Sequence, residues 1–207
     1  MRFQLNDSVL AALRMHRDKR HLERVTRWKE WSPLHGESGL EEAALLGRLK
    51  AAFSEGADPA RFGNEYVLAM DRLQEEVENE HDAFLLEPGM GPMLYLTADG
   101  RVLTDGRSWD GAPLRAATDS EAIAALVIGA DKTGVRELLE LLPPCPSDGV
   151  QCPMCAGRRR ATPIPGMEGP PIICLLCGGR GWAVRPMLEA AAANGTWPNK
   201  FSPQPRN

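Results

Sequence analysis

Residues 152–159 read CPMCAGRR and residues 174–182 read CLLCGGRGW, and together they hold four of the five cysteines of this 207-residue chain. In each stretch the two cysteines are separated by two residues, and 18 residues separate the two pairs. A C-x-x-C segment places two sulfurs on one tight turn, and four thiolates are a common ligand set for tetrahedral Zn²⁺. The spacing therefore predicts one zinc ion held by Cys152, Cys155, Cys174 and Cys177.

The predicted site uses protein ligands at all four positions. It has no open coordination position, so we expect its zinc to be structural and not catalytic. Two other interpretations of the cysteine pairs are redox-active dithiols and disulfides. Metal-binding thiols persist in a reducing compartment, so the pattern also predicts a cytoplasmic protein. The fifth cysteine, Cys145, has no C-x-x-C partner and is predicted to be a bystander thiol or an alternative ligand.

Arginines and a tryptophan follow the cysteine pairs. Guanidinium groups bind phosphate and aromatic rings stack on bases. A candidate surface for nucleic acid or a partner protein therefore consists of Arg158, Arg159, Arg160, Arg180 and Trp182. The alternative is that the arginines are solvated and that the tryptophan packs against the cysteines as a small core.

The two cysteine-rich stretches also follow a glycine pattern. The second matches C-x-x-C-x-G-x-G in full, and the first matches C-P-x-C-x-G with Arg159 in place of the last glycine. Residues 150–183 thereby resemble the cysteine-rich zinc region of DnaJ-type co-chaperones. The resemblance implies that the module helps to hold a client or partner protein. That family has four such repeats where this chain has two, and the chain has no His-Pro-Asp motif, so recruitment of a heat-shock ATPase is not implied.

Charge is unevenly distributed along the chain, whose net charge is −4. Residues 1–34 contain eight Lys/Arg and four Asp/Glu, whereas residues 35–149 contain nine and 22. Residues 150–185 contain five and one. The acidic middle repels nucleic acid, so only the two ends can attract it. No run of 18 apolar residues occurs, so neither a membrane span nor a membrane partner is expected.

The N-terminal part, residues 1–35, is predicted to be a basic helical segment. Apolar residues recur within 7–31 at helical spacing, first around Val9 and then as a patch of Leu22, Val25 and Trp28. The basic residues between the two patches form either a solvated face or a docking surface.

Residues 36–143 are predicted to form an acidic α+β domain. Its helices are expected after a capping box at Ser38–Glu41, over about 64–84, after a second capping box at Thr118–Glu121, and from Thr133 to Leu142. Between them, a hairpin over 93–104 with Asp99-Gly100 in its turn, and a third strand near 108–111, predict a small antiparallel meander. The acidic face of the 64–84 helix is expected to be solvated, or to bind a metal or a basic partner.

The remaining boundaries come from proline and glycine. Residues 144–151 are predicted to be a linker, 152–183 the zinc module, and 184–207 a short helix from Pro186 to Ala193 followed by a disordered tail. Residues 36–143 are also loosely similar to the SUKH superfamily of bacterial immunity and interaction domains. That similarity implies an acidic surface that binds a partner protein, such as a toxin.

No catalytic pattern accompanies the cysteines. No triad, H-E-x-x-H motif or P-loop includes the four histidines, which are His16, His21, His35 and His81. The sequence therefore predicts a protein that is not an enzyme and that acts as a zinc-binding interaction, assembly or chaperone-like factor. The alternatives are a nucleic-acid-binding zinc-ribbon regulator and an immunity-type partner-binding protein.

Overall fold

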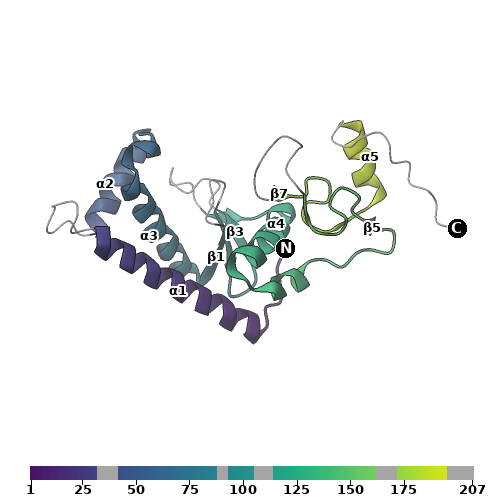
Figure 1. Cartoon of the computed structure of the whole chain (residues 1–207), viewed down its shortest axis with the longest axis horizontal. Helices are drawn as coiled ribbons and strands as arrows, with labels where there is room; N and C mark the ends of the chain where they lie inside the picture. The colour runs from purple at the N-terminus through teal and green to yellow at the C-terminus, as the bar shows by residue number, and fades with distance from the viewer. Residues whose placement is uncertain (32–41, 88–92, 105–113, 162–171, 195–207) are drawn as a thin grey trace. The chain divides into compact units, whose positions relative to one another are not determined.

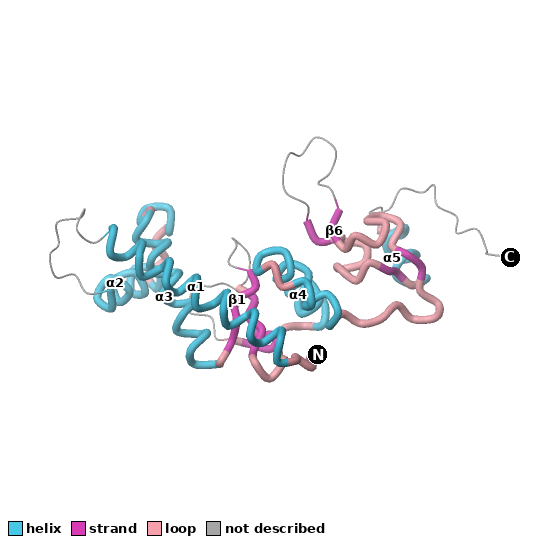
Figure 2. The backbone as a smooth tube through the Cα atoms, turned by 60° about the horizontal axis from the view of Figure 1, so that its bottom comes forward, coloured by secondary structure: helices cyan, strands magenta, loops and turns pink. Residues whose placement is uncertain are grey.

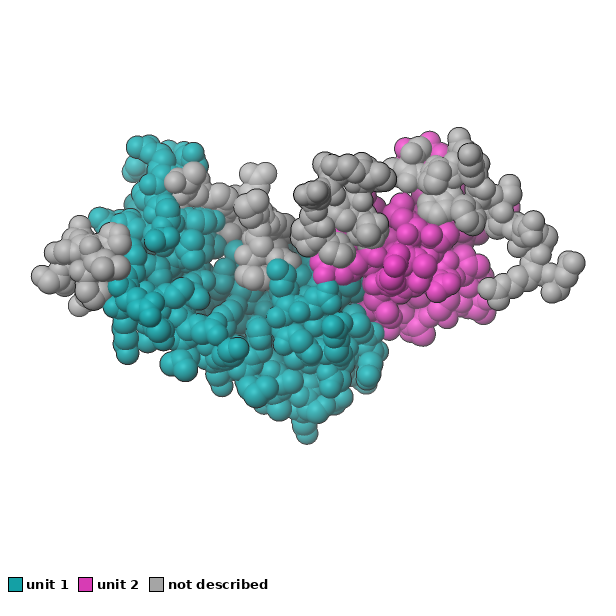
Figure 3. All heavy atoms as spheres, viewed as in Figure 1, with its two compact units in different colours: residues 1–141 teal, residues 142–207 magenta. Residues whose placement is uncertain are grey.

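A computed structural model describes residues 1–31, 42–87, 93–104, 114–161 and 172–194. The chain divides into two compact units, residues 1–141 and residues 142–207 (Figure 3). The predicted α+β class is confirmed, since helices surround a small antiparallel sheet and four cysteines cluster in the second unit. The predicted basic segment 1–35 contributes its helix to the same unit as the acidic body.

The N-terminal helix α1 spans Asp7–Trp31, the range that the sequence predicts. Asn6 caps its first turn, because the Asn6 side-chain oxygen accepts a hydrogen bond from the Val9 backbone N–H at 2.9 Å. The apolar patch predicted around Leu22 is wrong at that residue, whose side chain is 67% exposed. Charged contacts of the neighbouring residues Arg20, His21 and Arg24 hold this part of the helix, as described below.

Two further helices, α2 (Glu42–Ser54) and α3 (Asn64–His81), pack against each other and are joined through the 3₁₀ helix η2 (Pro59–Phe62) (Figure 1). Their apolar faces meet the C-terminal end of α1. The buried members of this cluster are Trp31, Leu45, Leu46, Leu49, Leu68 and Ala69. The capping box predicted at Ser38–Glu41 lies outside the described residues.

Helix α3 ends earlier than the sequence predicts. Asp82 follows it in the left-handed conformation, with φ 43°, and its N–H bonds to the Glu78 carbonyl. Ala83–Glu87 then forms strand β1, so the prediction of a helix to residue 84 is wrong at its end. Phe84 follows Val77 by seven residues, which is a helical spacing, and this hides the change of period.

The sheet of the first unit is antiparallel with the order β1-β2-β3-β4. The predicted hairpin is confirmed as β2 (Leu94–Thr97) and β3 (Val102–Thr104), while β4 is Arg115–Ala116. Gly100 in the turn has φ 85°, and a Cβ there would lie 1.8 Å from the Phe3 carbonyl oxygen, so only glycine fits. The third strand predicted near 108–111 lies outside the described residues.

Helices cover both faces of this sheet. On one face Tyr66, Leu73 and Val77 of α3 pack against Leu85 and other strand residues. On the other face lies α4 (Asp119–Thr133), which contacts β1 and β2. All four residues of β2 and all three of β3 are therefore buried, which explains why these strands show no alternation of polar residues.

Helix α4 begins at the predicted capping box. Thr118 accepts from the Glu121 N–H, and the Glu121 carboxylate accepts from the Thr118 N–H at 2.7 Å. Hydrogen bonds from Arg115 and Thr118 lower the pKa of Glu121 to about 2. The helix predicted to start at Thr133 is wrong: Thr133 ends α4, and the 3₁₀ helix η3 follows over Arg136–Leu141.

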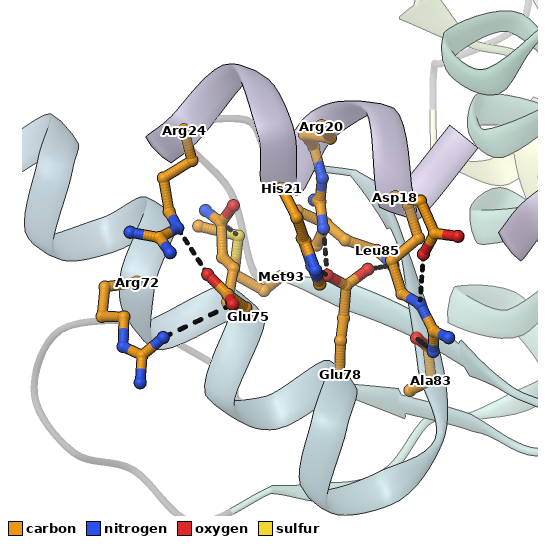
Figure 4. A network of polar contacts seen from close by, with 12 residues as sticks. Asp18, Arg20, His21, Arg24, Arg72, Glu75, Glu78, Ala83, Leu85 and Met93 are labelled. Carbon is orange, nitrogen blue, oxygen red and sulfur yellow. Dashed lines mark hydrogen bonds and ion pairs between the residues drawn. The ribbon is translucent and has the colours of Figure 1, made fainter. Parts of the chain in front are cut away.

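A layer of charged side chains joins α1 to α3 (Figure 4). Glu78 is 1% exposed, and its carboxylate contacts Arg20, His21 at 2.7 Å and the Leu85 backbone N–H at 2.7 Å. Beside it, Arg24 pairs with Glu75. We call these five residues the charged layer: Arg20, His21, Arg24, Glu75 and Glu78. The prediction of a solvated acidic face is therefore wrong at Glu75 and Glu78, which α1 covers, whereas the side chains of Glu76 and Glu80 on the same helix are 40% and 75% exposed.

The second unit is built from short elements (Figure 2). Its strands are β5 (Val150–Gln151), β6 (Arg160–Ala161), β7 (Ile172–Ile173) and β8 (Trp182–Ala183). The predicted short helix is confirmed as α5 (Arg185–Ala193). The predicted disordered tail beyond residue 194 lies outside the described residues.

Candidate metal centre

The four cysteines of the two C-x-x-C segments meet in one cluster. Their Sγ atoms all lie within 4.8 Å of one another, and all four side chains are fully buried. The Cys152–Cys174 and Cys155–Cys177 sulfur distances are 3.7 and 3.8 Å. These are too long for the ~2.05 Å bond of a disulfide. They match the edge of about 3.8 Å that four sulfurs at ~2.3 Å around a tetrahedral zinc ion require.

The cluster lies between two segments with the same local structure, residues 152–159 and residues 174–181, which we call the two knuckles. The pairing around them repeats with twofold symmetry. The strand before the first knuckle, β5, pairs with β8 after the second, and β6 pairs with β7 in the same way. Each knuckle also donates one backbone hydrogen bond to the other: Cys152 N–H to the Gly181 carbonyl at 2.9 Å, and Cys174 N–H to the Arg159 carbonyl at 3.0 Å.

Both knuckles turn through the same sequence of left-handed residues. In the second knuckle these are Gly178, Gly179 and Gly181, with φ 56°, 86° and 82°. In the first they are Ala156, Gly157 and Arg159, with φ 48°, 78° and 67°. Arg159 therefore adopts the conformation of the glycine that it replaces. The turn brings the Gly181 N–H to 3.4 Å from the Cys177 sulfur, where it stabilises thiolate charge.

Contacts among the sulfurs and burial shift the pKa values of the thiols in different directions. The hydrogen bond between Cys152 and Cys177 raises the pKa of Cys152 and lowers the pKa of Cys177 to about 5. Burial raises the pKa of Cys174 to about 11. A metal ion has to displace the protons that remain on the sulfurs, so metal affinity increases as the pH rises.

Two arginines of the predicted binding surface point back to the knuckles. Arg158 Nε donates to the Cys155 carbonyl, and Arg180 Nη1 donates to the Cys177 carbonyl, each at 3.2 Å. The Arg180 guanidinium also lies 5.9 Å from the centre of the Trp182 ring. The Trp182 indole N–H donates to the Pro143 carbonyl at 3.3 Å. Arg158 and Arg180 therefore hold their own knuckles and are not simply solvated as the alternative interpretation predicts, and the Trp182 indole is bonded to Pro143.

The cluster is covered by side chains that the sequence analysis did not single out. Leu176 is buried beside the sulfurs, and Met154, Leu188 and Ala191 pack against them. The apolar side of the predicted short helix could have identified Leu188 and Ala191. Cys145 is exposed and lies outside the sulfur cluster.

The arrangement can hold a metal ion such as zinc, with Cys152, Cys155, Cys174 and Cys177 as its ligands. When bound, zinc would supply four coordination bonds that cross-link the two knuckles, and a set of four thiolates leaves no position for a substrate. Within the described residues, no helix is both long and apolar enough to cross a membrane. Comparison with protein-family models, curated proteins and solved structures finds no match to this chain.

Proposed function

We propose that this protein is a non-enzymatic interaction or assembly factor, in which one structural zinc ion holds a small module that presents a surface to a partner protein. The observation that carries the proposal is the sulfur cluster, which is fully buried and has four protein ligands available. Such a site stabilises a fold and leaves no position for catalysis on the metal. A chaperone-like role in holding clients, as the DnaJ-type resemblance implies, is the form of this function that we favour.

Exposed apolar side chains on the module support a protein partner. Leu175, which lies between the two ligands of the second knuckle, is 76% exposed. Ile172 and Val150 are also exposed. Exposed apolar groups that lie together are a feature of surfaces that bind another protein. The module would act in a reducing compartment such as the cytoplasm, because its thiols have to stay reduced to bind metal.

The other two candidate functions have less support. Nucleic-acid binding would use the arginines of the knuckles, of which Arg158 and Arg180 each donate one N–H to a carbonyl of their own knuckle. Partner binding through an acidic surface of residues 36–143 would have fewer carboxylates available on α3, because Glu75 and Glu78 belong to the charged layer. We therefore propose that the second unit contains the binding surface.

The test compares three variants with the wild-type chain in pull-downs from lysate, after mass analysis of the metal. Cys174→Ser removes one ligand, Leu175→Ser removes only the exposed anchor, and Leu22→Ser removes a similarly exposed leucine from the first unit. We expect one zinc per wild-type chain, and a set of partners that is lost with both Cys174→Ser and Leu175→Ser but kept with Leu22→Ser. The same partners with all four chains would contradict the proposal.

A further inference from the structure

A cavity of about 240 Å³ lies in the first unit, among α1, β1 and α4. It is smaller than the roughly 300–1,000 Å³ of pockets that take drug-sized ligands, so it suits a compact ligand. Helix α1 contributes the residues of one face, at positions i, i+3, i+4 and i+7. The polar lining consists of His16, Lys19, Arg20 and Glu23 from α1 and Lys132 from α4.

Positive charge dominates this lining, although the chain as a whole is acidic. Three cationic side chains face one carboxylate, that of Glu23. Leu85 and Leu86 of β1, both buried, complete the lining with apolar groups, which weaken the screening of nearby charge. Lys19 and Glu23 lie 3.8 Å apart as an exposed pair. Within the described residues, Lys132 has no ion pair.

Arg20 carries hydrogen-bond donors that no described residue satisfies. Its Nη2 atom pairs with Glu78 in the charged layer. Its Nε and Nη1 atoms are buried and have no acceptor among the described residues. Buried donors of this kind need an acceptor, and a guanidinium group binds oxyanions through such N–H groups. The Arg20 side chain belongs to the cavity lining, so its positive charge favours an oxyanion there.

We propose that this cavity binds a compact oxyanion of the phosphate type, either free or as the terminal group of a small ligand. Lys132, Lys19 and Arg20 supply the charge, and His16 supplies a further N–H donor. Three cations against Glu23 and Glu78 leave a net charge of +1, which a protonated His16 raises to +2, so that the lining then matches an anion with two negative charges. The site belongs to the first unit and does not depend on the metal centre.

The histidine gives the site an expected pH dependence. Burial lowers the pKa of His16, and Arg20 and Lys19 lower it further, while Glu78 and Glu23 oppose them. Lys132 from α4 adds positive charge, and β1 contributes only leucines to the cavity. A bound anion favours protonated His16, so binding should strengthen as the pH falls. His21 also lies near this site, in contact with Glu78, and its contribution has to be separated from that of His16 by mutation.

The first experiment titrates inorganic phosphate into the full-length, zinc-loaded protein by calorimetry at constant ionic strength. We expect Lys132→Met to weaken binding about tenfold and Glu23→Gln to strengthen it about threefold, because each changes one charge at the site. Lys29→Met, at an exposed position of α1 outside the cavity, is the matched control and should change nothing. Thermal unfolding without phosphate should be the same for Lys132→Met and wild type, because Lys132 is exposed.

The second experiment uses sulfate, whose charge does not change near neutral pH, and phenyl phosphate beside free phosphate. Sulfate binding should strengthen from pH 8 to pH 6 in the wild type and lose this dependence in His16→Gln. Tighter binding of phenyl phosphate identifies the site as one for the end of a larger ligand, and tighter binding of free phosphate identifies the ion itself. No phosphate binding, equal loss in Lys132→Met and Lys29→Met, or weaker binding in Glu23→Gln would each overturn the proposal.

Discussion

Arg159 has a backbone conformation that belongs to a glycine in the matching position of the other knuckle. Its φ is 67°, against 82° for Gly181. A residue with a Cβ is strained there, at a cost on the order of 1 kcal/mol. The sequence pattern identifies Arg159 as the departure from the repeat, but it does not reveal whether the turn changes or the residue is strained. The structure shows that the turn is kept.

Replacing this arginine should therefore stabilise the metal-loaded module. We expect Arg159→Gly to raise the free energy of unfolding of the second unit by about 1 kcal/mol, because glycine adopts positive φ without strain. The measurement is thermal unfolding of the zinc-loaded protein, followed by the fluorescence of Trp182 in a chain whose other tryptophans are replaced by phenylalanine. Loss of stability in Arg159→Gly would show that the arginine side chain contributes more than its backbone costs.

Gly181→Ala is the matched control in the second knuckle. It should destabilise the module, because it introduces a side chain at φ 82° and places a Cβ 3.0 Å from the Gly157 carbonyl oxygen. The two substitutions therefore have opposite expected signs at equivalent positions. A stabilising Gly181→Ala would contradict the comparison of the two knuckles.

At the scale of elements, the charged layer fixes α1 on α3. Glu78 is buried and accepts from Arg20, His21 and Leu85, so removal of its charge leaves Arg20 without its carboxylate. Breaking a buried ion pair by changing one partner typically costs about 3–5 kcal/mol. We expect Glu78→Gln to lower the free energy of unfolding of the first unit by about 3 kcal/mol. Urea unfolding followed by far-UV circular dichroism measures this, since α1 to α4 contain most of the helix.

Glu80→Gln provides the comparison for this prediction. Glu80 lies on the same helix but its side chain is 75% exposed, so its substitution should change stability by less than about 0.5 kcal/mol. Equal losses in the two variants would mean that the net charge of α3, and not the charged layer, determines stability.

The sequence predicts single elements better than their pairing. The range of α1, the β2–β3 hairpin and the capping box of α4 follow from local signals and are confirmed. Strand β1 is missed because Phe84 keeps the helical spacing of the apolar residues of α3, seven residues after Val77. The charged layer is missed because it joins positions 57 and 58 residues apart, and a charge pattern on one helix does not identify its partner.

At the scale of the whole molecule, the two units are stabilised in different ways. The first unit buries a sheet between helices, as the predicted α+β body requires. In the second, the cluster around the cysteines contains few other apolar side chains, among them Leu176, Met154 and Leu188. The cysteine spacing predicts which sulfurs meet, because it reflects local turns. The spacing does not predict the contribution of α5, because Leu188 and Ala191 contact the cysteines only through the tertiary fold.

This difference predicts the effect of metal removal. Structural zinc contributes on the order of 10 kcal/mol to a small module, more than so few apolar contacts can replace. After chelation we expect the amides of the second unit to lose protection from hydrogen exchange, including those of Cys152 and Cys174, which bridge the knuckles. The amides of β2 and α4 should keep theirs, because their hydrogen bonds and apolar contacts lie within the first unit.

The same hydrogen-exchange measurement on cysteine variants distinguishes the effect of losing the metal from the effect of losing a thiol. Cys174→Ser should give the exchange pattern of the chelated protein, whereas Cys145→Ser should retain both metal and protection, because Cys145 lies outside the sulfur cluster. Mass analysis after chelation confirms that the metal has left. If the knuckle amides then stayed as protected as before, the module would fold on its own contacts, and the structural role proposed for the metal would be wrong.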